Sequence, residues 1–412
     1  MDEVVSSPVS LKERIGSLDV LRGVAVLGIL LMNSVCFSMV FAAYENPTVY
    51  DDLSGTGWWV WLSLHLIADQ KFIAIFSILF GAGVCIFTDR ADAKSHNVWP
   101  LQISRMGWLL LIGIVHAYCI WYGDILVTYA VAGVVLASLR KWDPKRLFIL
   151  GAISLGIVTL LINHMFGMTV SHLPEEVIAE MRSTADLTSE VNANEIAAYT
   201  GSWTGQLVHR IPTSLMMHLF IVPFFVFWRV VGLMLMGMAL YRWGVLSAKR
   251  STIFYIKMIA IGLLIGMPLI LVGVWQKSIH GWDPIRQHFV DGNWNIIGAG
   301  FVAFAWIGIV MLFCKQHRFA LVRKAFAAVG RMALTNYIAQ SLICTYLFYG
   351  HGLGWFGQVE RLQLLGIVVA IWIFQIIFSL IWLHFFRFGP LEWAWRSATY
   401  LKFQPMLVSS RK

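Results

Sequence analysis

Charged residues are scarce in this chain of 412 residues, in which Lys, Arg, Asp and Glu together make up only 13%. A soluble globular domain carries about 25% of them, so an ordinary soluble protein is excluded. Hydrophobic residues make up 58% of the chain and include 27 Phe and 19 Trp. This composition excludes intrinsic disorder, collagen and a simple coiled coil.

The motifs of soluble enzymes are also missing. The sequence contains no Walker A loop, no HExxH, no GxSxG and no GxGxxG, and it has no long polar stretch in which a soluble cofactor domain could fold. The five cysteines form no CxxC pair and stand at no metal-binding spacing from a histidine. We therefore expect neither a metal site nor a permanently bound cofactor. All five lie inside apolar runs: Cys36, Cys85, Cys119, Cys314 and Cys344.

Long apolar runs are the main feature of the sequence. A helix that crosses a bilayer needs about 20 apolar residues. Ten runs are candidates: 20–43, 58–88, 104–122, 125–139, 146–168, 211–241, 253–275, 295–314, 333–349 and 363–386. The pattern predicts an all-α polytopic membrane protein with about ten transmembrane helices, built as a single integral-membrane domain over residues 1–412.

Basic residues are divided unequally between the two sides of these runs. If the N-terminus is inside, 24 of the 31 Lys and Arg fall in inner segments and only five in outer ones. Because Lys and Arg accumulate in cytoplasmic segments, both termini are predicted to be cytoplasmic. The net charge of +9 then belongs to the inner segments, and we expect no nucleic-acid partner.

One long segment, 169–210, is predicted to lie outside the membrane. It holds six acidic residues, and Pro174 followed by EEVIAEMR is typical of a helix start. The segment either caps an outward-facing cavity or forms a solvated loop helix with no role at the site.

Ionisable residues inside apolar runs are costly and usually face a cavity or a partner. In the second run, His65 and Asp69 are four residues apart and share a helix face. Lys71 is turned about 200° away from Asp69, so it must reach a partner on another helix or water. The simpler alternative is an internal ion pair that holds helices together.

The third and fourth runs are joined by a very short hairpin. His116 lies in the outer third of one helix, and Asp124 opens the next after Trp121, Tyr122 and Gly123. The hairpin therefore holds His116 near Asp124. A carboxylate beside a histidine fixes the imidazole tautomer and raises its basicity, as a general base requires. Alternatively, Asp124 caps its helix and His116 satisfies a buried neighbour.

Three polar residues lie in the first run. Asp19 and Arg22 are three residues apart at its inner end, where an ion pair between them is the simplest interpretation. Asn33 lies three helical turns further out.

Four more polar residues lie in the sixth and ninth runs. Arg229 stands near mid-membrane and needs an anionic partner, either a carboxylate such as Asp69 or a substrate phosphate or acyl carrier. His218 lies nearer the outer end of the same run. In the ninth run, Asn336 and Gln340 share a face, which interhelical hydrogen bonding alone explains.

Several stretches resemble the YeiB-like family of bacterial inner-membrane proteins, whose C-terminal half is a domain of unknown function. The resemblance implies an inner-membrane location and a family-specific region at 315–412. The matching stretches are SLDVLRGVAVLGILLMN (17–33), Lys71-Phe72 with FSILFGAG (76–83), Arg105 with Gly113 to His116, GDIL (123–126) with Tyr129, VGRMALTNYIAQS (329–341) and GPLEWAWRSATY (389–400).

That family is similar to a distant branch of the transmembrane acyltransferase superfamily, which includes the lysosomal heparan-glucosaminide N-acetyltransferase. The LDxLRG pattern matches here. The superfamily also has a motif in which a histidine stands ten residues before an Ala-Asp pair. This chain does not match that motif, because His65 stands only four residues before Asp69. The resemblance implies transfer of an acyl group from a cytoplasmic donor to an acceptor on the far side, using an intramembrane histidine.

We therefore weigh three functions. The first is a membrane-embedded acyltransferase with His116 as base and Asp124 as its orienting carboxylate, with an acyl-coenzyme A as donor substrate. Its partners are membrane lipids and a small-molecule, lipid or glycan substrate. The second is a transporter or lipid-handling protein, and the third a non-catalytic scaffold. The residues expected to contact substrate are Asp19, Arg22, Asn33, His65, Asp69, Lys71, Arg105, His218, Arg229, Asn336 and Gln340.

Overall fold

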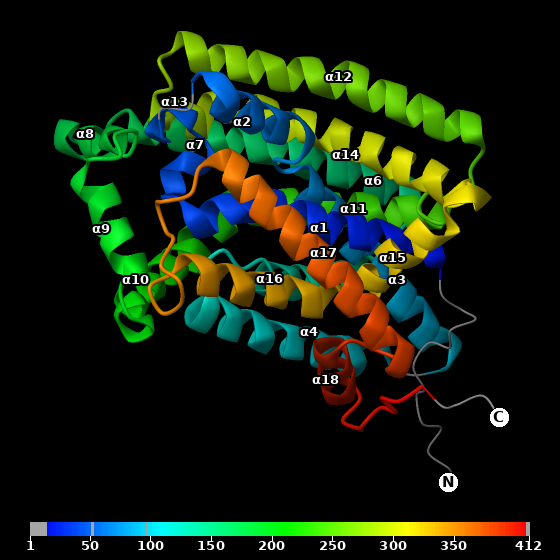
Figure 1. Ribbon diagram of the computed structural model, residues 1–412. Helices are drawn as coiled ribbons and strands as arrows, with labels where there is room; N and C mark the ends of the chain where they lie inside the picture. The colour runs from blue at the N-terminus through cyan, green and yellow to red at the C-terminus, as the bar shows by residue number, and fades with distance from the viewer. Residues whose placement is uncertain (1–14, 51–52, 96, 409–412) are drawn as a thin grey trace.

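The computed structural model describes residues 15–50, 53–95 and 97–408, and within these ranges the chain is a bundle of helices without a β-strand (Figure 1). The first half contains α1 (Gly16–Ser38), α2 (Gly55–Ile67), α3 (Lys71–Ala93), α4 (Val98–Val115), α5 (Leu126–Leu139), α6 (Pro144–Ile153), α7 (Thr159–Val170), α8 (Glu175–Ser183) and α9 (Glu190–Thr200). The second half contains α10 (Trp203–Met216), α11 (Phe227–Arg242), α12 (Thr252–Ile279), α13 (Pro284–Arg286), α14 (Gly292–Lys315), α15 (Ala320–Arg331), α16 (Ala333–Phe348), α17 (Arg361–Phe385) and α18 (Pro390–Thr399).

Shorter helical turns join several of these helices. Three are 3-10 turns: η2 (Phe41–Tyr44), η3 (Pro47–Tyr50) and η8 (His317–Phe319). Four are π-helical: η4 (His116–Ile120), η5 (Ser154–Val158), η6 (Met217–Val226) and η7 (Gln287–Asp291).

The prediction of a polytopic all-α membrane protein is confirmed. Among the described residues, eight helical segments are long and apolar enough to cross a membrane. The two remaining predicted runs, 125–139 and 333–349, are also helical but shorter, as α5 with 14 residues and α16 with 16. The second run is not one continuous helix. It breaks between α2 and α3, where Gln70 adopts a left-handed conformation with φ of 64°.

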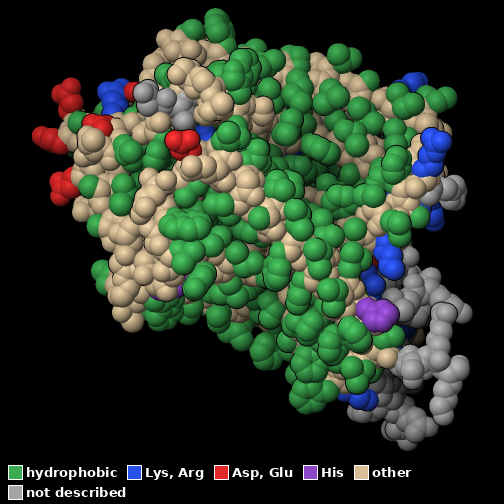
Figure 2. All heavy atoms as spheres, in the orientation of Figure 1, with side chains coloured by type: hydrophobic (Ala, Val, Ile, Leu, Met, Phe, Trp, Pro, Cys, Tyr) green, Lys and Arg blue, Asp and Glu red, His purple; other side chains and the backbone are tan. Residues whose placement is uncertain are grey.

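Charge separates the two ends of the bundle. In Figure 2, Lys and Arg gather at one end and Asp and Glu at the other, with hydrophobic side chains between them. We call the first the basic end, which includes the last turns of α11 and α14, and the second the acidic end, which carries α8 and α9 (Figure 1). Four of the basic residues counted above, Lys12, Arg14, Arg411 and Lys412, lie outside the described residues.

Helix α1 lies at the centre of the bundle, and α12 and α17 lie at its surface. The most apolar stretch of α1 is 83% buried, against 28% for each of the other two. One large cluster of buried side chains surrounds α1 along its length, and a second joins α3, α4, α5, α11 and α16. The candidate site lies between these helices, out of contact with bulk water.

Candidate functional site

His116 lies at the point where α4 changes to the π-helical turn η4. The wider turn closes with a hydrogen bond from the Trp121 backbone N–H to the His116 carbonyl, at 2.8 Å. Turns of this kind are uncommon and frequently occur at functional sites. The His116 side chain is almost fully buried, with 1% of its surface exposed.

Asp124 lies in the tight turn between η4 and α5 and is also buried. Its Oδ1 is 2.8 Å from His116 Nδ1, and its Oδ2 accepts a hydrogen bond from the Val127 backbone N–H at 2.8 Å. The two alternatives left open by the sequence are thus both present, because the carboxylate caps α5 and orients the histidine. Gly113 permits this approach, since a Cβ there would stand only 2.7 Å from Val127 N.

Ser341 completes this group, and the sequence interpretation missed it. Its Oγ lies 2.8 Å from His116 Nε2, and the residue is 1% exposed. The serine comes from α16, 225 residues further along the chain. An isolated serine in an apolar helix carries no signal of its partner, so only the packing of α16 against η4 reveals it.

A narrow cavity of about 190 Å³ leads from the basic end toward this group. The arginines among its lining residues lie near the basic end, and Arg105 is held between the rings of Phe87 and Trp395. The other end is lined by Ile125, which follows Asp124, and by Tyr337, whose ring centroid is 5.2 Å from that of His116. The four arginines that line the cavity are Arg22, Arg105, Arg331 and Arg396.

A second groove, of about 370 Å³ and lined by apolar side chains apart from His116, opens on the side of the bundle. It lies between α4, α16 and α18, and its lining includes Leu111 and Val115, each 48% exposed on the lipid-facing surface. His116 is the one ionisable residue in its lining. The histidine therefore stands between a cavity with an arginine-rich mouth and a groove suited to an alkyl chain.

Comparison with known proteins assigns the chain to a family. It is 35% identical to "Uncharacterized protein YeiB" of Escherichia coli (strain K12), over 94% of this chain and 96% of that relative. It is 33% identical to "Uncharacterized protein YxaH" of Bacillus subtilis (strain 168), over 98% of both chains. The chain belongs to the YeiB-like family. A family model described as "Protein of unknown function (DUF418)" matches residues 240–402, and no solved structure matches significantly.

The YeiB-like bundle contains a second buried polar cluster, separate from His116. His65 Nδ1 pairs with Asp69 Oδ2 at 3.0 Å, as their spacing predicts. Lys71 Nζ donates to the His65 carbonyl at 2.5 Å and to Asn295 Oδ1 on α14 at 2.8 Å. Asn295 Nδ2 in turn donates to Asp69 Oδ2 at 2.6 Å, so it links the ammonium to the carboxylate. Lys71 thus finds its partner on another helix, and Tyr44 completes the cluster with a 2.8 Å bond to Asp69 Oδ1.

The polar residues of the sixth run belong neither to the cluster around His116 nor to the cluster around Lys71. Arg229 forms no hydrogen bond or ion pair with a described residue, so it is not in direct contact with Asp69, and the alternative of a substrate anion stays a prediction. It lies half-buried beside a very small cavity that Gln70 also lines. His218 lies on η6, where its Nδ1 is 3.3 Å from Tyr118 Oη.

The polar residues of the ninth run hold helices together. Asn336 Nδ2 donates to Ser379 Oγ on α17 at 3.0 Å. Gln340 Nε2 donates to the Val26 carbonyl on α1 at 3.1 Å and to Gln375 Oε1 on α17 at 2.9 Å. All these groups are buried and paired within the protein, which agrees with the alternative of interhelical hydrogen bonding, and their contact with a substrate stays a prediction.

The polar residues of the first run include an internal ion pair and a residue that lines a cavity. Asp19 and Arg22 form the expected ion pair at 3.0 Å, and Arg22 also lines the cavity below His116. Asn33 is half-buried on α1 and forms no hydrogen bond that the described part of the chain records.

At the acidic end, α9 is held against the segment that follows α1 and against aromatic side chains. Glu195 accepts hydrogen bonds from the Phe41 backbone N–H at 3.1 and 3.2 Å. Burial raises the pKa of this carboxyl to about 7, and the bond from Phe41 acts in the opposite direction. Beneath it, the rings of Tyr199 and Tyr349 stack at 4.6 Å.

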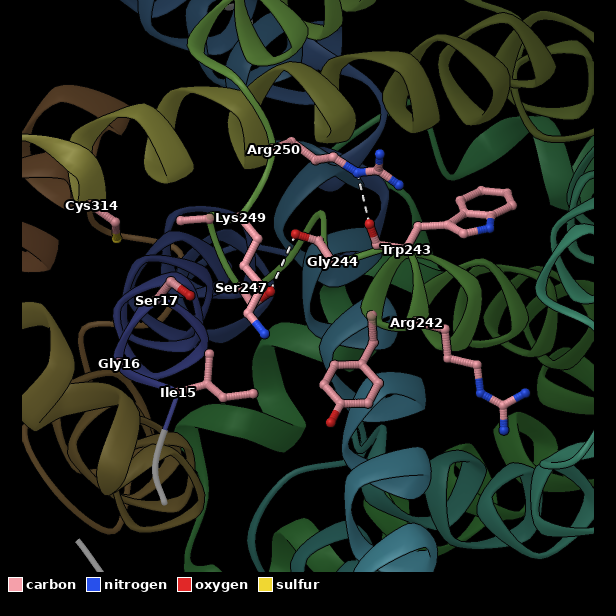
Figure 3. Close-up of a pocket in the computed structure, with 12 residues that line it drawn as sticks. Ile15, Gly16, Ser17, Arg242, Trp243, Gly244, Ser247, Lys249, Arg250 and Cys314 are labelled. Carbon is pink, nitrogen blue, oxygen red and sulfur yellow. Dashed lines mark hydrogen bonds between the residues drawn. The ribbon is translucent and has the colours of Figure 1, made fainter. Parts of the chain in front are cut away.

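A larger cavity, of about 870 Å³, lies elsewhere at the basic end (Figure 3). It is bounded by the start of α1, the end of α11 and the loop that carries Lys249 and Arg250. Arg250 Nε donates to the Trp243 carbonyl at 2.7 Å. None of the residues expected from the sequence to contact substrate lines this cavity, and neither does His116, Asp124 or Ser341.

Proposed function

We propose that the protein is a membrane-embedded acyltransferase of the bacterial inner membrane. In this proposal a thioester donor of the acyl-coenzyme A class enters at the basic end, which faces the cytoplasm. His116 acts as general base, and an acceptor receives the acyl group toward the acidic end. The observation that carries the proposal is the buried Asp124–His116 pair, which lies next to Ile125 and Tyr337 in the lining of an arginine-mouthed cavity.

The geometry supports a general base. Because Asp124 holds Nδ1, the proton of a neutral imidazole stays on that nitrogen, and Nε2 keeps a lone pair that can accept a proton. Asp124 also stabilises the imidazolium that forms when His116 takes the proton, as the carboxylate does in other acid–base sites. The position of both groups away from water strengthens this effect.

The cavity supports the class of donor. Guanidinium groups bind phosphates through paired hydrogen bonds, and a nucleotide-linked thioester carries several phosphates. Arg22 and Arg105 stand where those phosphates would remain near the aqueous side. The apolar walls further in, including Phe76 and Leu79, suit the uncharged arm that bears the thioester.

The test is acyl transfer in proteoliposomes that contain the full chain. Acetyl- and octanoyl-coenzyme A serve as donors, and the transfer of label to acceptors on the opposite side is measured. We expect His116→Ala to lose about 10²–10⁴-fold in rate, because proton transfer is removed. Asp124→Asn should lose a similar factor because the tautomer and the charge are lost.

His65→Ala is the matched control, since this histidine is also buried beside a carboxylate but belongs to the other cluster. It should retain most of the activity at equal amounts of folded protein. Turnover that persists in His116→Ala but is lost in His65→Ala would move the base to the second cluster.

A transporter is the second candidate, and the cluster around Lys71 and Asp69 favours it. Buried charges in the apolar part of a bundle mark transport paths as well as catalytic sites. In that case the wild type would show no turnover with any thioester donor. Lys71→Ala would instead abolish the uptake of a solute into the same proteoliposomes, and His116→Ala would not.

A further inference from the structure

We propose that Ser341 is a nucleophile that carries the acyl group as a covalent ester between donor and acceptor. This inference rests on the proposed acyl transfer and adds an intermediate to it. Asp124, His116 and Ser341 form a continuous chain of hydrogen bonds, with 2.8 Å between Asp124 Oδ1 and His116 Nδ1 and 2.8 Å between His116 Nε2 and Ser341 Oγ. This order of acid, base and hydroxyl is the one that activates serine in unrelated hydrolases.

The direction of each hydrogen bond follows from the groups present. Asp124 Oδ2 is engaged by the Val127 N–H, which leaves Oδ1 to accept the Nδ1–H of His116. Nε2 of a neutral imidazole then carries no proton and can only accept. The hydroxyl of Ser341 is therefore the donor, and its oxygen is polarised toward the alkoxide.

Comparison with other buried hydroxyls distinguishes Ser341 from a serine that merely satisfies its own helix. Ser77 and Thr88 donate to the carbonyl four residues earlier, each at 2.9 Å. The corresponding distance from Ser341 Oγ to the Tyr337 carbonyl is 3.5 Å. The Ser341 hydroxyl thus lies closer to His116 Nε2 than to the carbonyl of its own helix.

The surroundings provide an acyl pocket and a hydrogen-bond donor. The apolar groove beside His116 is lined by Ile338, one helical turn before Ser341, and can take an alkyl chain from the side. The indole N–H of Trp121 is buried and has no hydrogen-bond partner among the described residues. Its ring lies edge-on to the His116 ring, with centroids 6.3 Å apart. In the described part of the chain, the Trp121 N–H is thus an unpartnered donor on a ring beside the base, and an oxyanion formed during transfer needs a donor of this kind.

The two half-reactions balance. In the first, Ser341 Oγ attacks the thioester carbonyl while His116 Nε2 takes the hydroxyl proton. The C–S bond breaks, and the thiol leaves with that proton from His116. In the second, an acceptor hydroxyl or amine attacks the seryl ester and gives its proton to His116. The C–O bond to Ser341 breaks, and the serine oxygen recovers the proton.

The experiment uses an alkyl fluorophosphonate, which labels activated serines irrespective of the natural acyl donor. Full-length protein in proteoliposomes is treated with the probe, digested, and the labelled peptide is identified by mass spectrometry. We expect label on Ser341 in the wild type and its loss in Ser341→Ala. Labelling of His116→Ala should fall at least about 10²-fold because the base is absent.

Ser34→Ala is the matched control. Ser34 is equally buried in an apolar helix, but within the described ranges its hydroxyl bonds only to the carbonyl of Leu31. This variant should label like the wild type. Absence of label in folded wild type, or label that remains unchanged in Ser341→Ala, would overturn the proposal.

A second variant covers the case in which Ser341→Ala does not fold. Ser341→Cys keeps a donor of similar size, and with acetyl-coenzyme A it should accumulate an acetyl group on residue 341 that hydroxylamine removes. Acyl transfer that continues at wild-type rate in a folded Ser341→Ala protein would refute the covalent route and leave the acyltransferase itself intact. Serine labelling without any thioester turnover would leave the nucleophile intact and refute the donor class.

Discussion

Two buried histidines of this protein each bind an aspartate through Nδ1, but they differ in what their Nε2 atom contacts. Both His65 and His116 direct Nδ1 at an aspartate, at 3.0 and 2.8 Å. Nε2 of His116 meets the hydroxyl of Ser341, whereas Nε2 of His65 has no hydrogen-bond partner among the described residues. A base needs a proton source in reach, so the second nitrogen is what separates the two residues chemically.

The carboxyl of Glu195 makes stability depend on pH. Burial raises its pKa from 4.5 to about 7 in the folded protein. Between these values the folded state keeps a proton that the unfolded state releases, so the free energy of unfolding falls as the pH rises through this window, by up to about 3 kcal/mol. We expect the thermal midpoint in detergent to fall between about pH 5 and pH 8 in the wild type.

Glu195→Gln should remove this part of the fall because the amide does not titrate. Glu190→Gln, an exposed position on the same helix, should leave it in place. An equal fall in Glu195→Gln and the wild type would show that another group is responsible.

At the scale of helices, close approach depends on small residues rather than on hydrophobicity, because lipid is as apolar as the side chains. Helices α3 and α11 cross where Gly81 faces the Met234 carbonyl and Gly237 faces the Ile78 carbonyl. Helix α3 carries Lys71 at its first residue and lines the cavity with Phe76, so this crossing sets the positions of both polar clusters.

Gly81→Ala should therefore destabilise the bundle. The added Cβ would overlap the Met234 carbonyl oxygen, and overpacking of this kind costs about 1–3 kcal/mol. The measurement is the thermal midpoint of the detergent-solubilised protein. Gly107→Ala on α4 is the control, because nothing lies within 4 Å of its new Cβ. An equal effect of the two substitutions would contradict the role of the crossing.

At the scale of the whole molecule, the charges at the two ends predict how the bundle is oriented. Basic residues gather at one end and acidic residues at the other (Figure 2), so the arginine-mouthed cavity and the α8–α9 region are expected to face opposite sides of the bilayer. With the basic end inside, the donor would enter from the cytoplasm and α9 would cover the outer side.

Reporter fusions test this orientation. Green fluorescent protein placed after Lys412 should fluoresce, and alkaline phosphatase inserted between α8 and α9 should be active. The reciprocal pair of fusions should be silent and serves as the control. Activity of the same reporter at both positions would contradict the predicted topology of ten spans with cytoplasmic termini.

The sequence by itself determined the class of fold and the local contacts. Apolar runs of sufficient length must be helical in lipid, because backbone groups there have no water to bond. Spacing along one helix brought His65 to Asp69, and the short connection between two helices brought His116 to Asp124. Each of these contacts lies within one helix or one hairpin, where local geometry leaves few alternatives.

Only the tertiary structure decided which distant residues complete each cluster. Ser341 joins His116 across 225 residues, and Asn295 joins Lys71 across 224. The tertiary structure also places Asn336 and Gln340 in hydrogen bonds between helices. It brings Arg22, Arg105 and Arg396 into the lining of one cavity. The reason is physical: hydropathy and periodicity report the face and length of a helix, but its neighbours depend on the fit of small and large side chains across the bundle.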